Sequence, residues 1–351
     1  MAVSTAASVQ QAKADGEDGR SLMTNPGQPD EPRWFLHRLD ARSGRGIYAE
    51  TSRAQLRDQS FLDGRSRFWQ REKNRALPKR EDDQSPRLRF IFHVSFCGST
   101  LLARLLDAPG RVLSLREPHA YVDLANQVTA NGDGLSASPI DYARLRAQEM
   151  RATGAAGEQV VVKPSNWANS LIPYLCAPEL GATAVFMSMS LNSFLLAVLR
   201  GGRDRLTYAA QAAAHLTGKT GLGAGALELA VKGASDPVGQ VVRIAAVSHL
   251  VQERLFRTAM AARNWPEDHW IDFDRLIAAP GATAVQAGSA LGLPVDEEEL
   301  VRKADGRLEA HSKDQSRSFS AARRVQENAE VIGHHGALIA EVVKWSQEIA
   351  I

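Results

Sequence analysis

A glycine followed by two hydroxyl residues lies where a short apolar run ends and a helical pattern begins, in HVSFCGSTLLARLL over residues 93–106. This order predicts a strand, a tight turn and a helix. At such a junction several backbone N–H groups and the positive end of a helix dipole converge. Together they can bind a phosphate group. A bulky side chain at the glycine would close this cradle. The residues predicted to hold a phosphate-bearing ligand are Cys97, Gly98, Ser99, Thr100 and Leu101.

The loop departs from the nucleoside triphosphate pattern GxxxxGK[ST]. His93 occupies the first glycine position, and Ser99 replaces the lysine that normally reaches the outer phosphates. A kinase or ATPase is therefore disfavoured. Residues 218–220, GKT, match the end of the same pattern, but no strand precedes them and Ala213 stands at the first glycine position. We interpret them as the end of a small-residue helix, followed by a flexible loop that is a candidate lid.

Short unbroken apolar runs alternate with helical patterns along most of the chain, which is typical of parallel strands covered on both faces. The sequence predicts a doubly wound, mainly parallel α/β sheet of P-loop type, with helices on both faces and a helical C-terminal part. Ligands of such sheets bind at the carboxyl ends of the strands. Strands are expected at 90–96, 111–115, 159–163, 182–189 and 270–273, and helices near 139–152, from 167, at 192–200 and at 241–263.

The chain of 351 residues is expected to form one large domain or two small ones. Residues 1–32 are poor in apolar side chains and are expected to be a disordered tail. Residues 33–86 are expected to form an N-terminal cap with a hairpin at 34–49, followed by a charged linker from residue 71. The main domain is expected to cover residues 87–351.

Composition excludes several classes of function. Lysine and arginine total 42 against 40 acidic residues, so there is no reason to expect a nucleic-acid partner. The two cysteines are too few for a disulfide framework, which predicts a reducing, cytoplasmic compartment and no structural zinc. The N-terminus lacks a signal-peptide pattern, and no apolar run reaches about 18 residues, so no membrane span is expected.

Residues 97–118, CGSTLLARLLDAPGRVLSLREP, resemble the phosphosulfate-binding loop of sulfotransferases that depend on 3'-phosphoadenosine-5'-phosphosulfate (PAPS). Two further pieces follow in matching order. Residues 160–175 are similar to the family's strand ending in Lys-Pro, and residues 270–300 to its late strand, acidic turn and helix. The resemblance implies PAPS as donor, no metal, and a hydroxyl or amine acceptor on a small molecule, carbohydrate or peptide.

The same comparison shows departures from the family pattern. The loop usually carries Lys or Arg where this chain has Phe96, and the Arg and Ser that hold the donor's 3'-phosphate are replaced by Met189 and Ala197. Each lost charge-assisted hydrogen bond removes about 1.5 to 3 kcal/mol, so other cations would have to bind the 3'-phosphate. The candidates are Arg200, Arg203, Arg205, Lys313 and Arg317.

Sulfuryl transfer requires a positioned cation and a base for the acceptor proton. Lys163 and Glu117 follow two different expected strands, so they should converge beside the loop. Lys163 would stabilise charge on the transferring group. Glu117 is the candidate general base, and His119 is the second candidate.

Two alternatives to a sulfotransferase-like enzyme remain. One is a P-loop kinase or other phosphotransferase, which binding of ATP with magnesium would favour. The other is a degenerate member that binds a nucleotide or a partner without turnover, which the replaced phosphate-binding residues favour. His93 is interpreted as a packed strand residue, and His334 and His335 as surface residues.

Overall fold

The computed structural model describes residues 33–77, 88–128, 141, 157–233, 236–307, 310–311, 314–318 and 321–351. The expected tail at 1–32 lies outside these residues, as does nearly all of the expected helix at 139–152. Lys313 also lies outside them.

An antiparallel sheet forms the N-terminal cap. It consists of β1 (Arg33–Asp40), β2 (Arg45–Thr51) and β3 (Glu72–Ala76), in that order across the sheet. The predicted hairpin is confirmed, but β3 lies in the segment that we interpreted as a linker, so that interpretation is wrong for these residues. All side chains of β3 are exposed. The strand pairs through its backbone at the sheet edge, and its sequence therefore lacks an apolar alternation.

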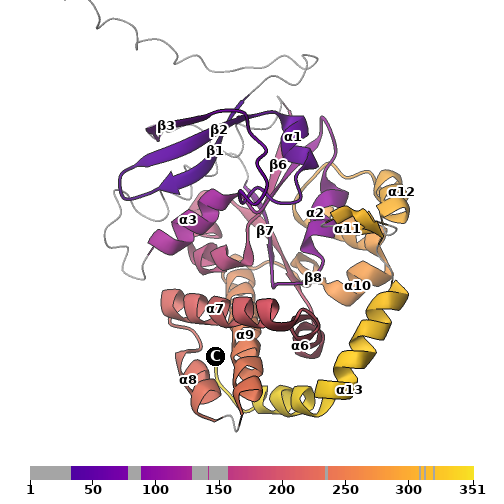
Figure 1. Ribbon diagram of the computed structural model, residues 1–351. Helices are drawn as coiled ribbons and strands as arrows, with labels where there is room; N and C mark the ends of the chain where they lie inside the picture. Colours follow the sequence, from indigo (N-terminus) through magenta and orange to yellow (C-terminus); the bar gives the residue numbers. More distant parts are fainter. Residues whose placement is uncertain are drawn as a thin grey trace, which may run out of the picture.

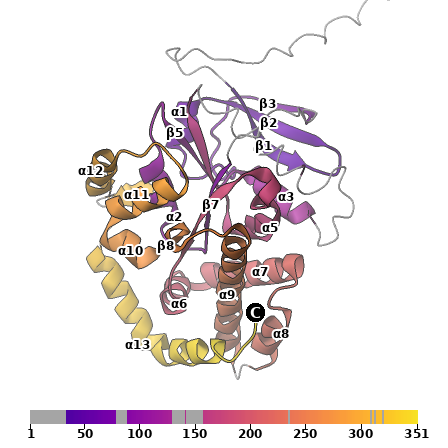
Figure 2. The same cartoon turned by 180° about the vertical axis from the view of Figure 1, so that it is seen from behind.

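The main sheet is parallel and has the order β5-β6-β4-β7-β8. Helices flank it in both views of the molecule (Figures 1 and 2). The α/β fold class and the predicted apolar runs are confirmed, because the central strands are almost entirely buried. The strands are β4 (Arg89–His93), β5 (Val112–Arg116), β6 (Gln159–Lys163), β7 (Thr183–Ser188) and β8 (Trp270–Asp272).

Helices make up most of the remaining described chain, as expected, and none of those described combines the length and apolar composition needed to cross a membrane. The α-helices are α1 (Arg53–Asp58), α2 (Ser99–Leu106), α3 (His119–Gln127), α5 (Ile172–Leu175), α6 (Leu191–Arg200), α7 (Gly202–Thr220), α8 (Ala224–Lys232), α9 (Pro237–Arg263), α10 (Phe273–Ala278), α11 (Pro280–Ala290), α12 (Glu297–Arg307) and α13 (Ala321–Ser346). Short 3-10 helices occupy Asn166–Leu171, Pro178–Leu180 and Glu267–His269, and β9 (Ala310–His311) and β10 (Asp314–Ser318) form a small antiparallel sheet.

The region after Thr220 is helical, whereas the sequence predicted a flexible loop and candidate lid. α8 follows α7 after a short turn and packs on α9, where a Cβ at Gly223 would come within 2.7 Å of Val251. The ammonium of Lys219 donates to the carbonyl oxygens of Asn126 at 2.6 Å and Val128 at 2.8 Å. This lysine therefore joins the end of α7 to the end of α3.

The cap is joined to the main sheet at the turn between β5 and α3. The N–H of Leu62 donates to the carbonyl oxygen of Arg116 at 2.7 Å, and the N–H of His119 donates to the carbonyl oxygen of Leu62 at 3.2 Å. The guanidinium of Arg116 is buried and donates to the carbonyl oxygen of Gln59 at 2.6 Å. The cap thus fixes the turn that carries Glu117.

Candidate active site

The loop between β4 and α2 has the predicted strand, turn and helix order. Gly98 lies directly before α2 with φ of 73°, in the left-handed region that favours glycine. A Cβ there would meet the ring of Phe273 at 3.2 Å and Leu276 at 3.4 Å. The backbone conformation and the packing of α10 therefore both favour glycine at this position.

Gly98 and Gly110 give a matched pair of substitutions. Both have positive φ, but an added Cβ at Gly110 meets nothing within 4 Å. We expect Gly110→Ala to lower the free energy of unfolding by about 1 kcal/mol through backbone strain alone. Gly98→Ala should lower it further, because Phe273 must also move. Urea unfolding would check this order, and equal losses would contradict the packing role of Phe273.

The predicted phosphate-binding residues are largely buried around this turn. Cys97 is fully buried, and its thiol donates to the carbonyl oxygen of Val94 at 2.9 Å. Ser99 and Thr100 are 6% and 2% exposed. The N–H of Leu101 donates to the carbonyl oxygen of Gly98 at 2.8 Å. The thiol therefore stabilises the loop by a hydrogen bond within it, and the N–H of Leu101 is hydrogen-bonded at the first turn of α2.

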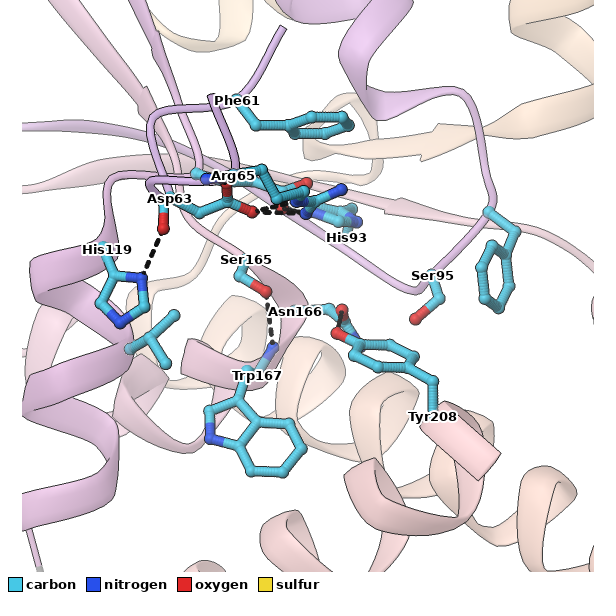
Figure 3. Close-up of a pocket in the computed structure, with 13 residues that line it drawn as sticks. Phe61, Asp63, Arg65, His93, Ser95, His119, Ser165, Asn166, Trp167 and Tyr208 are labelled. Carbon is cyan, nitrogen blue, oxygen red and sulfur yellow. Dashed lines mark hydrogen bonds and ion pairs between the residues drawn. The ribbon is translucent and has the colours of Figure 1, made fainter. Parts of the chain in front are cut away.

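A cavity of about 490 Å³ opens at the carboxyl ends of β4, β5 and β6, where ligands of such sheets bind. The sheet and its loops contribute polar groups, and the cap and α7 complete the walls (Figure 3). The lining residues are Phe61, Asp63, Arg65, His93, Ser95, Phe96, Glu117, His119, Val122, Ser165, Asn166, Trp167 and Tyr208.

Sequence reasoning did not identify the contributions of the cap and of α7. Phe61, Asp63 and Arg65 come from the segment between α1 and β3, and Tyr208 comes from α7. Tyr208 donates to Asn166 Oδ1 at 2.5 Å, and burial raises the pKa of its phenol to about 12. No local pattern marks these residues, because only the packing of the cap and of α7 onto the sheet brings them to the cavity.

Lys163 and Glu117 meet as the strand-end argument predicted. Lys163 Nζ lies 2.6 Å from Glu117 Oε1. Glu117 lines the cavity and has φ of 54°, and its N–H donates to the carbonyl oxygen of Lys163 at 2.6 Å. Lys163 is fully buried and is not among the lining residues. In this arrangement the carboxylate faces the cavity and the ammonium lies behind it.

His93 is packed, as expected, but it also contacts the buried lysine and lines the cavity. Its Nδ1 lies 2.8 Å from the carbonyl oxygen of Val94, and its Nε2 lies 3.1 Å from Lys163 Nζ. Burial, together with the charge of Lys163, lowers the pKa of His93 to about 3. The ring is therefore neutral. Its Nε2 also lies 3.1 Å from the carbonyl oxygen of Pro164, so Nε2 accepts from Lys163 when the proton is on Nδ1 and donates to Pro164 when the proton is on Nε2.

His119 has an acceptor at each ring nitrogen. Its Nδ1 lies 2.8 Å from the carbonyl oxygen of Asp63, and its Nε2 lies 3.5 Å from Asp123 Oδ1. The interaction with Asp123 raises the pKa of His119. Burial alone would raise the pKa of Asp123, but hydrogen bonds from His119, Arg38 and the N–H of Leu39 lower it to about 2. Because two acceptors favour the imidazolium, His119 is less suited than Glu117 to accept a proton.

The raised pKa of His119 predicts a pH dependence of stability. The interactions of His119 stabilise the folded state fully below its unfolded pKa of about 6.5. This stabilisation is lost as the pH rises through the higher pKa of the folded state. The free energy of unfolding of the wild type should therefore fall more steeply than that of His119→Gln as the pH rises above about 6.5. Urea unfolding across this range would measure both slopes. Parallel slopes would show that His119 is not stabilised as imidazolium.

The cationic candidates for the 3'-phosphate lie in different surroundings. The guanidinium of Arg205 stacks on the Phe96 ring of the loop at 4.8 Å, and burial lowers its pKa. Arg200 instead donates to Asn328 Oδ1 of α13 at 2.8 Å. Arg203 is exposed, and Arg317 lies in β10. The structure thus brings Arg205, and not Arg200, into contact with the loop.

Comparisons with known proteins do not show which family the chain belongs to. No protein-family model matches the chain, and no curated protein matches it significantly. Among solved structures, the chain is similar to the sulfotransferase STF1 from Mycobacterium tuberculosis H37Rv. The two are 16% identical, the match covers 71% of this chain and 78% of that chain, and the TM-score is 0.33. The α/β class itself stands on the strand order and the flanking helices described above.

Proposed function

We propose that this chain is a sulfotransferase-like enzyme that transfers a sulfuryl group from PAPS to a hydroxyl or amine acceptor. The observation that carries the proposal is the carboxylate of Glu117. It faces a cavity at the carboxyl end of the sheet, beside the loop between β4 and α2, and is held there by Lys163. The resemblance of residues 97–118 to the phosphosulfate-binding loop is the reason for proposing PAPS as the donor.

The donor would bind at the loop between β4 and α2. The N-terminus of α2 favours an anion, and Ser95 and Phe96 connect this loop to the cavity. Arg205 is the best candidate to bind the 3'-phosphate, because its guanidinium lies against Phe96 of the loop. A guanidinium can hold a phosphate through two parallel hydrogen bonds.

The transfer step follows from these positions. The acceptor oxygen or nitrogen forms a bond to sulfur while the bond from sulfur to the 5'-phosphate oxygen breaks. The electron pair of that bond leaves with the phosphate oxygen, which yields adenosine 3',5'-bisphosphate. The acceptor proton passes to Glu117. The ammonium of Lys163, 2.6 Å from that carboxylate, holds Glu117 in position to take this proton.

The size of the cavity favours a small-molecule acceptor. Its volume of about 490 Å³ lies in the range of roughly 300 to 1,000 Å³ that is usual for small-molecule sites. Trp167 and Tyr208 form one side of the cavity, across from Phe61 in Figure 3. An acceptor would thus lie between the cap and α7, with its hydroxyl or amine turned toward Glu117.

A thermal-shift panel tests the donor. Adenosine 3',5'-bisphosphate at 100 times its dissociation constant should stabilise the protein by about 2.7 kcal/mol, and adenosine 5'-phosphate should bind more weakly. Equal binding of these two would mean that the 3'-phosphate is not recognised. A shift with ATP and magnesium alone would favour the phosphotransferase alternative. The absence of any nucleotide shift would favour a non-catalytic protein.

A further inference from the structure

The N-terminal cap places one arginine at the wall of the cavity. Arg65 lies in the segment between α1 and β3, and its side chain is 62% exposed. It pairs with Asp63 at 2.5 Å, and its guanidinium stacks on the Phe61 ring at 4.2 Å. The same guanidinium lies 3.5 Å from Glu117 Oε2. Figure 3 shows Phe61, Asp63 and Arg65 along one edge of the cavity.

A transferring sulfuryl group needs a cation, and the usual positions do not offer one here. The loop has Phe96 where a basic residue would reach the donor. Lys163 is fully buried behind Glu117 and His93. Among the described residues that line the cavity, the cationic side chains are His119 and Arg65. His119 is engaged at both nitrogens, whereas Arg65 is a long and largely exposed side chain.

We propose that Arg65 supplies the cation that contacts the sulfuryl oxygens of the bound donor. This inference rests on the proposed function. The acceptor gives its proton to Glu117 at the moment when its oxygen or nitrogen bonds to sulfur, so the sulfur must lie near this carboxylate. A guanidinium 3.5 Å from Glu117 Oε2 is therefore within reach of the sulfuryl oxygens. The cap thus completes the active site rather than only covering it.

The resting contacts of Arg65 are compatible with this role. Its partner Asp63 holds the guanidinium at the cavity edge when no donor is present, and stacking on Phe61 limits its orientations. A planar guanidinium matches a pair of sulfuryl oxygens with two parallel N–H donors, as it does a phosphate. Because the side chain is largely exposed, exchanging Asp63 for the sulfuryl group requires little rearrangement of the fold.

The test compares PAPS with adenosine 3',5'-bisphosphate, which lacks the sulfuryl group. Isothermal titration calorimetry would measure both affinities for the wild type, Arg65→Ala and Arg65→Lys. Arg67→Ala is the matched control, because Arg67 is exposed in the same segment, donates to the carbonyl oxygens of Trp69 and Gln70, and does not line the cavity. Arg65→Ala should lower the affinity for PAPS about 10- to 100-fold and leave the affinity for the bisphosphate unchanged. Arg65→Lys should lower the affinity for PAPS by a smaller factor. Arg67→Ala should change neither affinity.

Other outcomes separate this inference from the proposed function. If the wild type binds both nucleotides and Arg65→Ala leaves the PAPS affinity unchanged, the sulfuryl contact is wrong and the proposed function stands. Equal weakening of both nucleotides would also overturn the contact, because Arg65 would then act on the shared part of the donor. If the wild type binds neither nucleotide, the proposed function fails and this inference fails with it.

Discussion

Lys163→Met should lower the free energy of unfolding by about 3 to 5 kcal/mol, which is the usual loss when one partner of a buried ion pair is removed. Lys163 is fully buried, and the side chain of Glu117 is only 13% exposed. Without the ammonium, the carboxylate would be poorly solvated and His93 Nε2 would lose its contact with Lys163. Urea unfolding measures the loss directly.

A double-mutant cycle distinguishes the ion pair from general packing. Glu117→Gln alone leaves the ammonium with a neutral partner, and the double variant removes both charges from the buried site. The loss in the double variant should be smaller than the sum of the two single losses by at least about 1 kcal/mol, because neighbouring charges couple. Additive losses, or a loss below about 1 kcal/mol in Lys163→Met, would show that the pair does not hold the site together.

Glu117→Gln should reduce turnover by about 100-fold or more, because general-base catalysis typically contributes 10²- to 10⁴-fold. The amide has almost the same shape as the carboxylate and can still accept from Lys163, but it cannot take the acceptor proton. The affinity for adenosine 3',5'-bisphosphate should stay unchanged, since the carboxylate does not contact the donor's nucleotide part. Radiolabelled PAPS and a panel of hydroxyl and amine acceptors would identify a substrate and measure turnover.

His119→Gln is the control for this result. His119 lines the same cavity but faces the carbonyl oxygen of Asp63 and the carboxylate of Asp123, so its loss should affect turnover much less. Near wild-type turnover in Glu117→Gln, combined with a large loss in His119→Gln, would identify the histidine as the base instead.

The convergence of Glu117 and Lys163 could be anticipated from the sequence because it depends on a general property of parallel sheets. Arg116 of β5 is paired in register with Lys163 of β6, so the residue after β5 lies beside the lysine. The burial of Lys163 could not be anticipated in the same way. Lys163 contacts His93, which stands at the end of a third strand, and Glu117, whose φ is positive, and neither feature is visible in a local sequence pattern.

The role of the cap was outside the reach of local sequence patterns. The backbone of Leu62 forms hydrogen bonds to Arg116 and His119, which lie before and after Glu117. Arg65, from the same segment, lines the cavity. These contacts join parts of the chain that are far apart in sequence, so the periodic pattern of apolar residues does not predict them. Likewise, the conformation of Gly98 follows from a loop pattern, whereas its contact with Phe273 of α10 is visible only in the folded chain.

The measurement that tests the nucleotide site most directly is hydrogen–deuterium exchange of the wild type with and without adenosine 3',5'-bisphosphate. Binding at the loop between β4 and α2 should slow exchange in peptides covering residues 94–101. It should leave residues 216–221, where the GKT sequence ends α7, unchanged. Unchanged exchange at 94–101, or protection confined to 216–221, would contradict a donor site at this loop.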